Sequence, residues 1–164
     1  MSLPLTNPFN GSKLAEIEYD TADDVDAKLD QARRTQRAWR DLSLDERSRI
    51  VRSGVAAVEA ASEEIARNVS LQMGKPLGEA RGELRTFFAR AEQALSDAPS
   101  ALAPEVIADQ ADIVRRIEHA PLGTVLNLAA WNYPLLIPIN VFLPALLAGN
   151  VVLLKHSAKT VLTG

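Results

Sequence analysis

Residues 119–154 contain no Asp, Glu, Lys or Arg, and this uncharged stretch is bounded by Glu118 and Lys155. Apolar segments of this length are buried either in a protein core or in a membrane. Helix-breaking prolines and polar amides within it disfavour a membrane span. They are Pro121, Pro134, Pro138, Pro144, Asn127, Asn132, Asn140 and Asn150. The stretch therefore predicts buried elements of a protein core, and we expect no membrane partner.

The uncharged stretch divides into a strand, a helix and a second strand. Residues 124–129 (TVLNLA) and 151–154 (VVLL) are short apolar runs that predict strands. Residues 135–148 predict an apolar helix between them, and Gly149 with Asn150 would end it. Strands that are apolar on both faces are typical of parallel sheets covered by helices. The predicted fold class is therefore α/β.

The first part of the chain predicts amphipathic helices. Residues 23–40 carry an apolar stripe among charges, and Thr21 with Asp24 forms a weak capping pair at the start. Ser43 and Glu46 form a stronger capping box for the next helix. The N-terminal segment therefore predicts helices with one solvated face, whereas the helix predicted in the uncharged stretch has none.

Two further helices are predicted before the apolar stretch. Ser62 is expected to cap the first of them, and residues 73–76 (MGKP) to end it. The second covers residues 77–97, and Pro99 and Pro104 would end it. Its predicted inward side chains are Leu84, Phe87, Phe88, Ala91 and Leu95.

The predicted elements do not complete a sheet. Residues 113–119 (IVRRIEH) predict a half-exposed strand. A buried strand–helix–strand unit needs neighbouring strands and helices on both faces. We therefore expect this chain to be the front part of a larger α/β protein, completed by a C-terminal region or by another subunit. The alternative is a complete helical domain with one small sheet.

Composition excludes several classes of function. The 164 residues include 18 Lys and Arg against 21 Asp and Glu, a net charge of −3, which disfavours nucleic-acid binding. The chain has no cysteine, and neither a GxGxxG nor a Walker A motif occurs. His119 and His156 lack ligand spacing, so we expect no metal site. The N-terminus does not look like a signal peptide, so we expect a cytoplasmic location.

Few polar groups are placed to carry chemistry. The carboxylates lie on amphipathic helices, where we expect them to be solvated, so no buried acid or base is predicted. Asn132 and Lys155 follow or end the two predicted strands, and ligands of parallel sheets bind at that edge. Asn132 offers an oxyanion donor, and Lys155 a cation for a ribose or phosphate. Alternatively, Asn132 caps the following helix and Lys155 only ends a strand.

At these residues the chain resembles the aldehyde dehydrogenase superfamily. The resemblance rests on residues 121–160, PLGTVLNLAAWNYPLLIPINVFLPALLAGNVVLLKHSAKT, and on Met-Gly-Lys-Pro at residues 73–76. It implies the start of a Rossmann-like parallel sheet, NADP or NAD as cofactor, and oxidation of an aldehyde to an acid through a cysteine thiohemiacetal. A small charged aldehyde such as succinate semialdehyde is the expected substrate class.

The resemblance also implies roles for individual residues. Asn132 corresponds to the family's oxyanion-hole asparagine. The implied cofactor-binding residues are Leu128, Ala129, Ala130, Trp131, Asn132, Lys155, His156, Ser157 and Ala158. The family's glutamate for the adenosine 2′-hydroxyl is replaced by Ala158, which removes a repulsion against a 2′-phosphate. This departure favours NADP over NAD.

By the same resemblance, residues 1–164 are the N-terminal part of a cofactor-binding domain. Residues 1–110 are mainly helical, 111–120 resemble the oligomerisation region, and 121–164 begin the Rossmann-like sheet, without a catalytic domain. We expect a homo-oligomer, and a chain inactive alone because nucleophile and base are missing. The alternatives are a truncated, non-catalytic binding or interaction module, and an acyl-phosphate or acyl-CoA reductase of the same superfamily.

Overall fold

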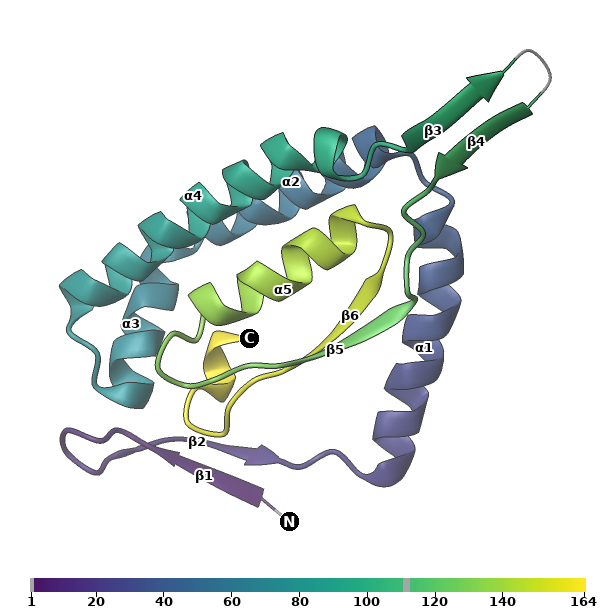
Figure 1. The fold of residues 1–164 in the computed structure, drawn as a ribbon. Helices are drawn as coiled ribbons and strands as arrows, with labels where there is room; N and C mark the ends of the chain where they lie inside the picture. Colours follow the sequence, from purple (N-terminus) through teal and green to yellow (C-terminus); the bar gives the residue numbers. More distant parts are fainter. Residues whose placement is uncertain (1, 111–112) are drawn as a thin grey trace.

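A computed structural model describes residues 2–110 and 113–164 of the chain (Figure 1). The strands within these residues pair as three two-stranded sheets. The elements are β1 (Ser2–Thr6), β2 (Lys13–Glu18), α1 (Ala22–Arg40), α2 (Leu44–Ala60), α3 (Ser62–Met73), α4 (Leu77–Ala101), β3 (Glu105–Gln110), β4 (Ile113–Ile117), β5 (Thr124–Leu128), α5 (Leu136–Leu147), β6 (Val151–Lys155) and the 3-10 helix η1 (Val161–Thr163).

The apolar helix α5 lies at the centre of the core. It packs against α4 and α2 on one side and against β5 and β6 on the other (Figure 1). Ile139, Leu143 and Leu147 of α5 are each 1% exposed, and burying one such side chain contributes about 1.5–3 kcal/mol. The predicted buried helix is therefore confirmed. None of the helices that the structure describes is both long and apolar enough to cross a membrane.

The predicted helix ends depend on local side chains, and most are confirmed. The capping pairs Thr21–Asp24 and Ser43–Glu46 both form in full, so each N-cap hydroxyl accepts from the backbone of the acidic residue three positions on. Gly74 ends α3 in the left-handed conformation, with φ of 76°. The prediction for Ser62 was wrong, because Ser62 is the first helical residue and the chain passes from α2 to α3 through Ala61 without a side-chain cap.

Helix α4 is longer than predicted. It continues through Pro99 to Ala101, so Pro99 does not end it. A proline inside a helix removes one donor, but the next turn still closes because the Leu102 N–H donates to the Ala98 carbonyl at 3.0 Å. Of the predicted inward side chains of this helix, Phe88 is only partly buried, whereas the other four are buried.

Three strands were not predicted. β1 and β2 form an antiparallel hairpin at the N-terminus, and β3 pairs antiparallel with β4. The strand predicted over 113–119 ends at Ile117, and its side chains are exposed rather than half-exposed. Residues 111 and 112, which the prediction assigned to the oligomerisation region, lie outside the described residues.

The β3–β4 hairpin projects from the helices (Figure 1). It carries exposed apolar side chains. These are Val106, Ile107, Ile113, Val114 and Ile117.

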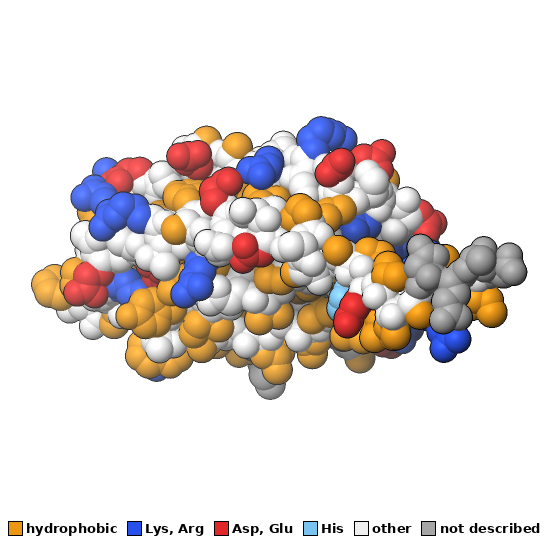
Figure 2. Space-filling model, turned by 45° about the horizontal axis from the view of Figure 1, so that its top comes forward, with side chains coloured by type: hydrophobic (Ala, Val, Ile, Leu, Met, Phe, Trp, Pro, Cys, Tyr) orange, Lys and Arg blue, Asp and Glu red, His pale blue; other side chains and the backbone are white. Residues whose placement is uncertain are grey.

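Figure 2 shows one face of the molecule, where charged side chains are spread over the upper part and hydrophobic ones gather along the lower edge. Such an apolar edge is typical of a surface that another chain segment or another subunit covers.

Strands β5 and β6 pair in parallel, with Thr124 opposite Val151 and Leu128 opposite Lys155. The buried Asn127 faces α5, where its Nδ2 donates to the Pro138 carbonyl at 3.1 Å. Because side chains alternate along a strand, Leu126 and Leu128 point to the opposite face, where they are 63% and 65% exposed. One face of this parallel pair is thus covered by α5, whereas the opposite face is only partly covered, by α1, in the described part of the chain.

The C-terminal end of α5 is held by side chains from α1 and α2. Gln36 Nε2 donates to the Gly149 carbonyl at 3.3 Å, and Trp39 Nε1 donates to the Leu146 carbonyl at 2.9 Å. Arg47 Nε donates to the Leu147 carbonyl at 3.0 Å. A helix leaves its last carbonyls unpaired and carries partial negative charge there, so a guanidinium is favourable at this end.

The ion pair between α3 and α4 predicts a pH-dependent stability. Hydrogen bonds from Arg81 and then from Arg67 lower the pKa of Glu63 from 4.5 to about 2. A depressed carboxyl pKa contributes stability above the unfolded value, and this stability is lost as the pH falls to the folded value. We expect the urea midpoint of the wild type to fall more steeply between pH 4.5 and 2 than that of Glu63→Gln. Superimposable pH profiles for the two proteins would contradict this expectation.

Candidate functional site

The carboxyl ends of β5 and β6 meet at one edge of the parallel pair. Beyond the last paired residues, the Ala129 N–H donates to the Lys155 carbonyl at 3.0 Å and extends the pairing by one residue. The chain then turns away through Ala130, Trp131 and Asn132 towards α5. The predicted residues Asn132 and Lys155 therefore follow neighbouring strands at the same edge.

A buried ion pair supports the loop that carries Asn132. The side chains of Lys75 and Glu83 pair through Nζ and Oε2 and are only 8% and 1% exposed. The second carboxylate oxygen, Glu83 Oε1, accepts from the Leu135 N–H at 2.9 Å and the Leu136 N–H at 3.1 Å. Glu83 thus provides the N-terminal cap of α5, where the helix dipole favours a negative charge.

The expectation that the carboxylates are solvated was wrong for Glu83. This residue lies on the inward stripe of α4, three positions after Ala80 and four before Phe87, both of which are buried. Its helical spacing is therefore that of a core position. A carboxylate at a core position needs a partner, and this spacing was the signal in the sequence that could have identified it.

Two lysines lie over aromatic rings of the same loop. Lys75 Nζ is 4.3 Å from the ring centroid of Tyr133, and Lys159 Nζ is 4.6 Å from that of Trp131. Both are within the range of a cation–π interaction. Both rings remain about half exposed. The loop thus presents aromatic surface and the positive charge of Lys159 next to Asn132, while Lys75 is paired with the buried Glu83.

Asn132 itself does not cap α5. The first N–H groups of that helix are taken by Glu83, and only the backbone carbonyl of Asn132 has a partner, Lys75 Nζ at 3.0 Å. The side-chain amide of Asn132 is exposed and makes no hydrogen bond within residues 2–110 and 113–164. The capping alternative was therefore wrong, and the amide is available to a ligand.

Lys155, His156 and Ala158 line one hollow of about 560 Å³. Apolar side chains of β5 and β6, including Leu126 and Leu154, form part of its wall, together with β2 and the start of α1. Burial lowers the pKa of His156 below its ordinary 6.5, which favours the neutral ring at pH 7. The buried Nδ1 of His156 has no hydrogen-bond partner among the described residues.

The predicted cofactor residues fall into two groups. Leu128 lies opposite Lys155 in the register, and Lys155 Nζ donates to the His156 carbonyl at 3.3 Å, so these residues lie together at the end of β6. Ser157 shapes the following turn, where its Oγ accepts from the Lys159 N–H at 3.3 Å. Ala130, Trp131 and Asn132 form the second group on the exposed loop and do not line the hollow.

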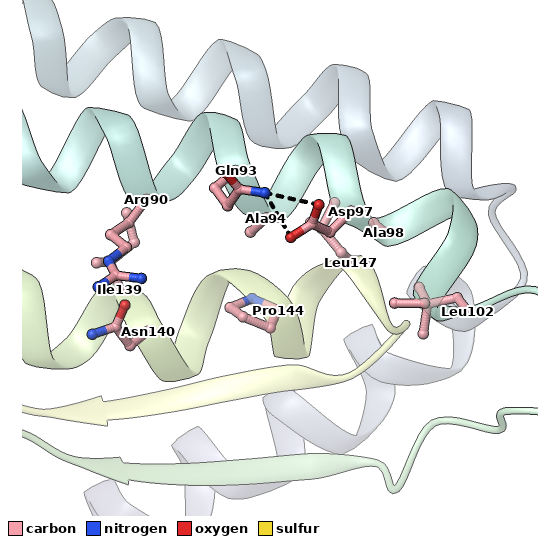
Figure 3. A pocket seen from close by; sticks show the side chains of 11 residues that line it. Arg90, Gln93, Ala94, Asp97, Ala98, Leu102, Ile139, Asn140, Pro144 and Leu147 are labelled. Atoms are coloured by element: carbon pink, nitrogen blue, oxygen red, sulfur yellow. Dashed lines mark hydrogen bonds between the residues drawn. The ribbon is translucent and has the colours of Figure 1, made fainter.

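Another hollow, of about 300 Å³, lies between α4 and α5 (Figure 3). Ile139 and Leu147 form an apolar floor, and Arg90 and Asn140 lie towards one end. Gln93 Nε2 donates to both carboxylate oxygens of Asp97, at 2.8 and 2.9 Å, so this rim is already paired. None of the predicted site residues lines this hollow.

Comparison with known proteins gives a family match over the whole chain. The model of the aldehyde dehydrogenase family matches residues 1–164. The chain is 34% identical to "Succinate semialdehyde dehydrogenase [NAD(P)+] Sad" of Escherichia coli, covering 92% of this chain and 32% of that protein. It is 33% identical to 3,6-anhydro-alpha-L-galactose dehydrogenase of Streptomyces coelicolor, covering 99% of this chain and 33% of that protein. The chain thus spans about a third of the curated relatives it matches.

Solved structures give the same result. An Escherichia coli NADP-dependent enzyme superposes with a TM-score of 0.91 at 30% identity, over 99% of this chain and 34% of that one. The structure of 3,6-anhydro-L-galactose dehydrogenase in complex with NAP superposes with a TM-score of 0.90 at 27% identity, over 99% of this chain and 34% of that one. The expected resemblance and fold are therefore confirmed.

The buried ion pair predicts a large effect of one substitution on stability. Glu83→Ala leaves a buried ammonium and two N–H groups of α5 without an acceptor, and breaking a buried pair in this way costs about 3–5 kcal/mol. Glu92, on the same helix, forms an exposed pair with Arg52, so Glu92→Ala should cost at most about 1 kcal/mol. Urea unfolding of both variants tests this difference. Equal losses would show that the Lys75–Glu83 pair does not hold the core.

Proposed function

Because the chain belongs to the aldehyde dehydrogenase family, we propose that it supplies part of the cofactor site and the oxyanion donor of an NAD(P)-dependent aldehyde dehydrogenase. The observation that carries the proposal is the parallel pairing of β5 and β6, which puts Lys155 at the carboxyl end of β6 and the loop that carries Asn132 after the carboxyl end of β5. Ligands of open parallel sheets bind outside the carboxyl ends of the strands.

The hollow beside Lys155 could hold one end of a dinucleotide cofactor. Its volume of about 560 Å³ is within the usual range of ligand sites, and Lys155 and His156 are among the polar residues that line it. Lys155 would bind a ribose hydroxyl or phosphate, and Ala158 leaves room beside it. The bound cofactor would accept a hydride from the substrate. The absence of a carboxylate at Ala158 favours a 2′-phosphate, hence NADP.

Asn132 would stabilise the charge that develops on the aldehyde oxygen. Its exposed side-chain amide has no partner among the described residues, so donating to an oxyanion breaks no existing hydrogen bond within them. Trp131 and Tyr133 flank it with apolar surface. These 164 residues contain no cysteine, so we propose that they do not turn over aldehyde by themselves.

The substrate proposed is a small charged aldehyde such as succinate semialdehyde. Succinate semialdehyde dehydrogenases are among the similar proteins. Lys159, which lies over the Trp131 ring, adds positive charge near Asn132, whereas the charge of Lys75 is neutralised by Glu83. A negatively charged aldehyde would be attracted to this end of the site.

The β3–β4 hairpin is the proposed contact between copies of the protein. Its exposed Val106, Ile107 and Val114 would leave water when a second copy packs against them. We therefore propose a homo-oligomer.

Substitution of Asn132 tests the proposed activity. In the longest polypeptide that carries these residues, we expect NADP-linked oxidation of succinate semialdehyde, and we expect Asn132→Ala to lower kcat by about 100-fold, as loss of one oxyanion donor does. Asn140→Ala, which changes an exposed amide outside the loop, is the matched control. Turnover of an acyl-phosphate or acyl-CoA instead would favour the reductase alternative.

Substitution of Ala158 tests the cofactor. Ala158→Glu places a carboxylate beside Lys155, where it would repel a 2′-phosphate and accept from a 2′-hydroxyl. We expect the Kd of NADP to rise at least tenfold while that of NAD falls or stays constant, measured by titration of intrinsic fluorescence. Ala158→Gln, which adds the bulk without the charge, separates repulsion from crowding. A tenfold preference of the unsubstituted protein for NAD would contradict the proposal.

A further inference from the structure

We propose that Lys75 is a positioning residue for Asn132, and that the buried Lys75–Glu83 pair holds the loop in the conformation that presents the Asn132 amide. This inference rests on the proposed function, because it assigns Lys75 a purpose only if Asn132 takes part in the reaction. Lys75 lies between α3 and α4, and in the proposed function it contacts neither the substrate nor the cofactor.

The ammonium group of Lys75 is fully engaged. A lysine has three N–H donors, and the structure gives this one three partners. They are the Glu83 carboxylate, the Asn132 carbonyl at 3.0 Å, and the face of the Tyr133 ring at 4.3 Å. Two of the three partners belong to the loop after β5. The lysine is therefore aimed at the backbone of this loop and not at solvent.

The same ion pair holds the loop a second time, three residues further on. Glu83 Oε1 accepts from the N–H groups of Leu135 and Leu136. At its other end the loop is tied to β6, since the Ala129 N–H donates to the Lys155 carbonyl. The backbone around Asn132 is thus fixed on both sides, while its side-chain amide has no partner in the described part of the chain. Such preorganisation gives an oxyanion donor its effect, because the donor need not reorient during the reaction.

Burial makes the arrangement rigid. Glu83 is 1% exposed and Lys75 8% exposed, so water does not compete for either group. An uncompensated ammonium would be costly there, and Glu83 removes that cost. Replacing Lys75 with an apolar chain of similar length would leave Glu83 to its two α5 N–H groups but would release the Asn132 carbonyl.

A double-mutant cycle distinguishes positioning from general stability. In the longest polypeptide carrying this chain, Lys75→Met should lower kcat about tenfold with little change in the KM for NADP. In the Asn132→Ala background the same substitution should lower kcat less than twofold, because no amide remains to be positioned. A purely structural lysine would cause the same loss in both backgrounds, and that additive result would overturn the inference. Lys13→Met, which removes an exposed lysine paired with Glu16 and outside both hollows, is the matched control and should leave kcat unchanged.

Amide hydrogen exchange tests the clamp without relying on activity. Peptides that cover residues 130–137 should exchange at least tenfold faster in Lys75→Met, whereas peptides from β1 and β2 should not change. Unchanged exchange in residues 130–137 would overturn the inference even if activity falls. If Asn132→Ala keeps full activity, the oxyanion role fails, and positioning for catalysis fails with it. If exchange rises but no aldehyde is oxidised by the unsubstituted protein, the clamp stands and the proposed function is the part that fails.

Discussion

Helix α5 cannot satisfy its own ends, and the rest of the structure is organised around that constraint. The helix is apolar almost throughout, and no residue of its own caps either terminus by a side-chain hydrogen bond. Glu83 of α4 accepts from its first N–H groups, and Trp39 and Arg47 donate to its last carbonyls. The signs of Glu83 and Arg47 match the helix dipole. Three surrounding helices therefore hold the central one in place, and β5 and β6 take their position from it.

The local parts of this arrangement could be predicted from the sequence. The two capping boxes and the Gly74 stop depend on residues at most four positions apart, so their chemistry is visible in a short window. The apolar stretch predicted β5, α5 and β6 within about one residue at most boundaries. By contrast, the N-terminal hairpin and β3 were missed, because their pairing depends on partner strands and not on a strong apolar alternation. Pro99 misled the prediction of the α4 end, since one lost donor near a helix terminus is tolerated.

The candidate site shows the same division. Asn132 and Lys155 could be predicted to follow or end neighbouring strands because parallel pairing brings carboxyl ends together, and the observed register puts Leu128 opposite Lys155. The pairing of Lys75 with Glu83 could not be predicted from the Met-Gly-Lys-Pro motif, and Glu83 is 52 positions from the Leu135 N–H that it caps. Its position on the inward stripe of α4 was the only local sign. A carboxylate at helical spacing from the buried Ala80 and Phe87 indicates that a buried partner exists somewhere in the chain. Which residue that partner is can be known only from the three-dimensional fold.

The distance along the chain between α5 and its caps has a consequence for biosynthesis. The side chains of Gln36, Trp39, Arg47 and Glu83 precede the groups they bind by 52 to 113 residues, and these four are N-terminal to α5. Chains grow from the N-terminus at about 5–20 residues per second, so α1, α2 and α4 leave the ribosome seconds before α5 does. The most apolar segment of the protein thus emerges when its partners have already been made. Vectorial synthesis therefore shortens the time for which this aggregation-prone helix lacks a surface to pack against.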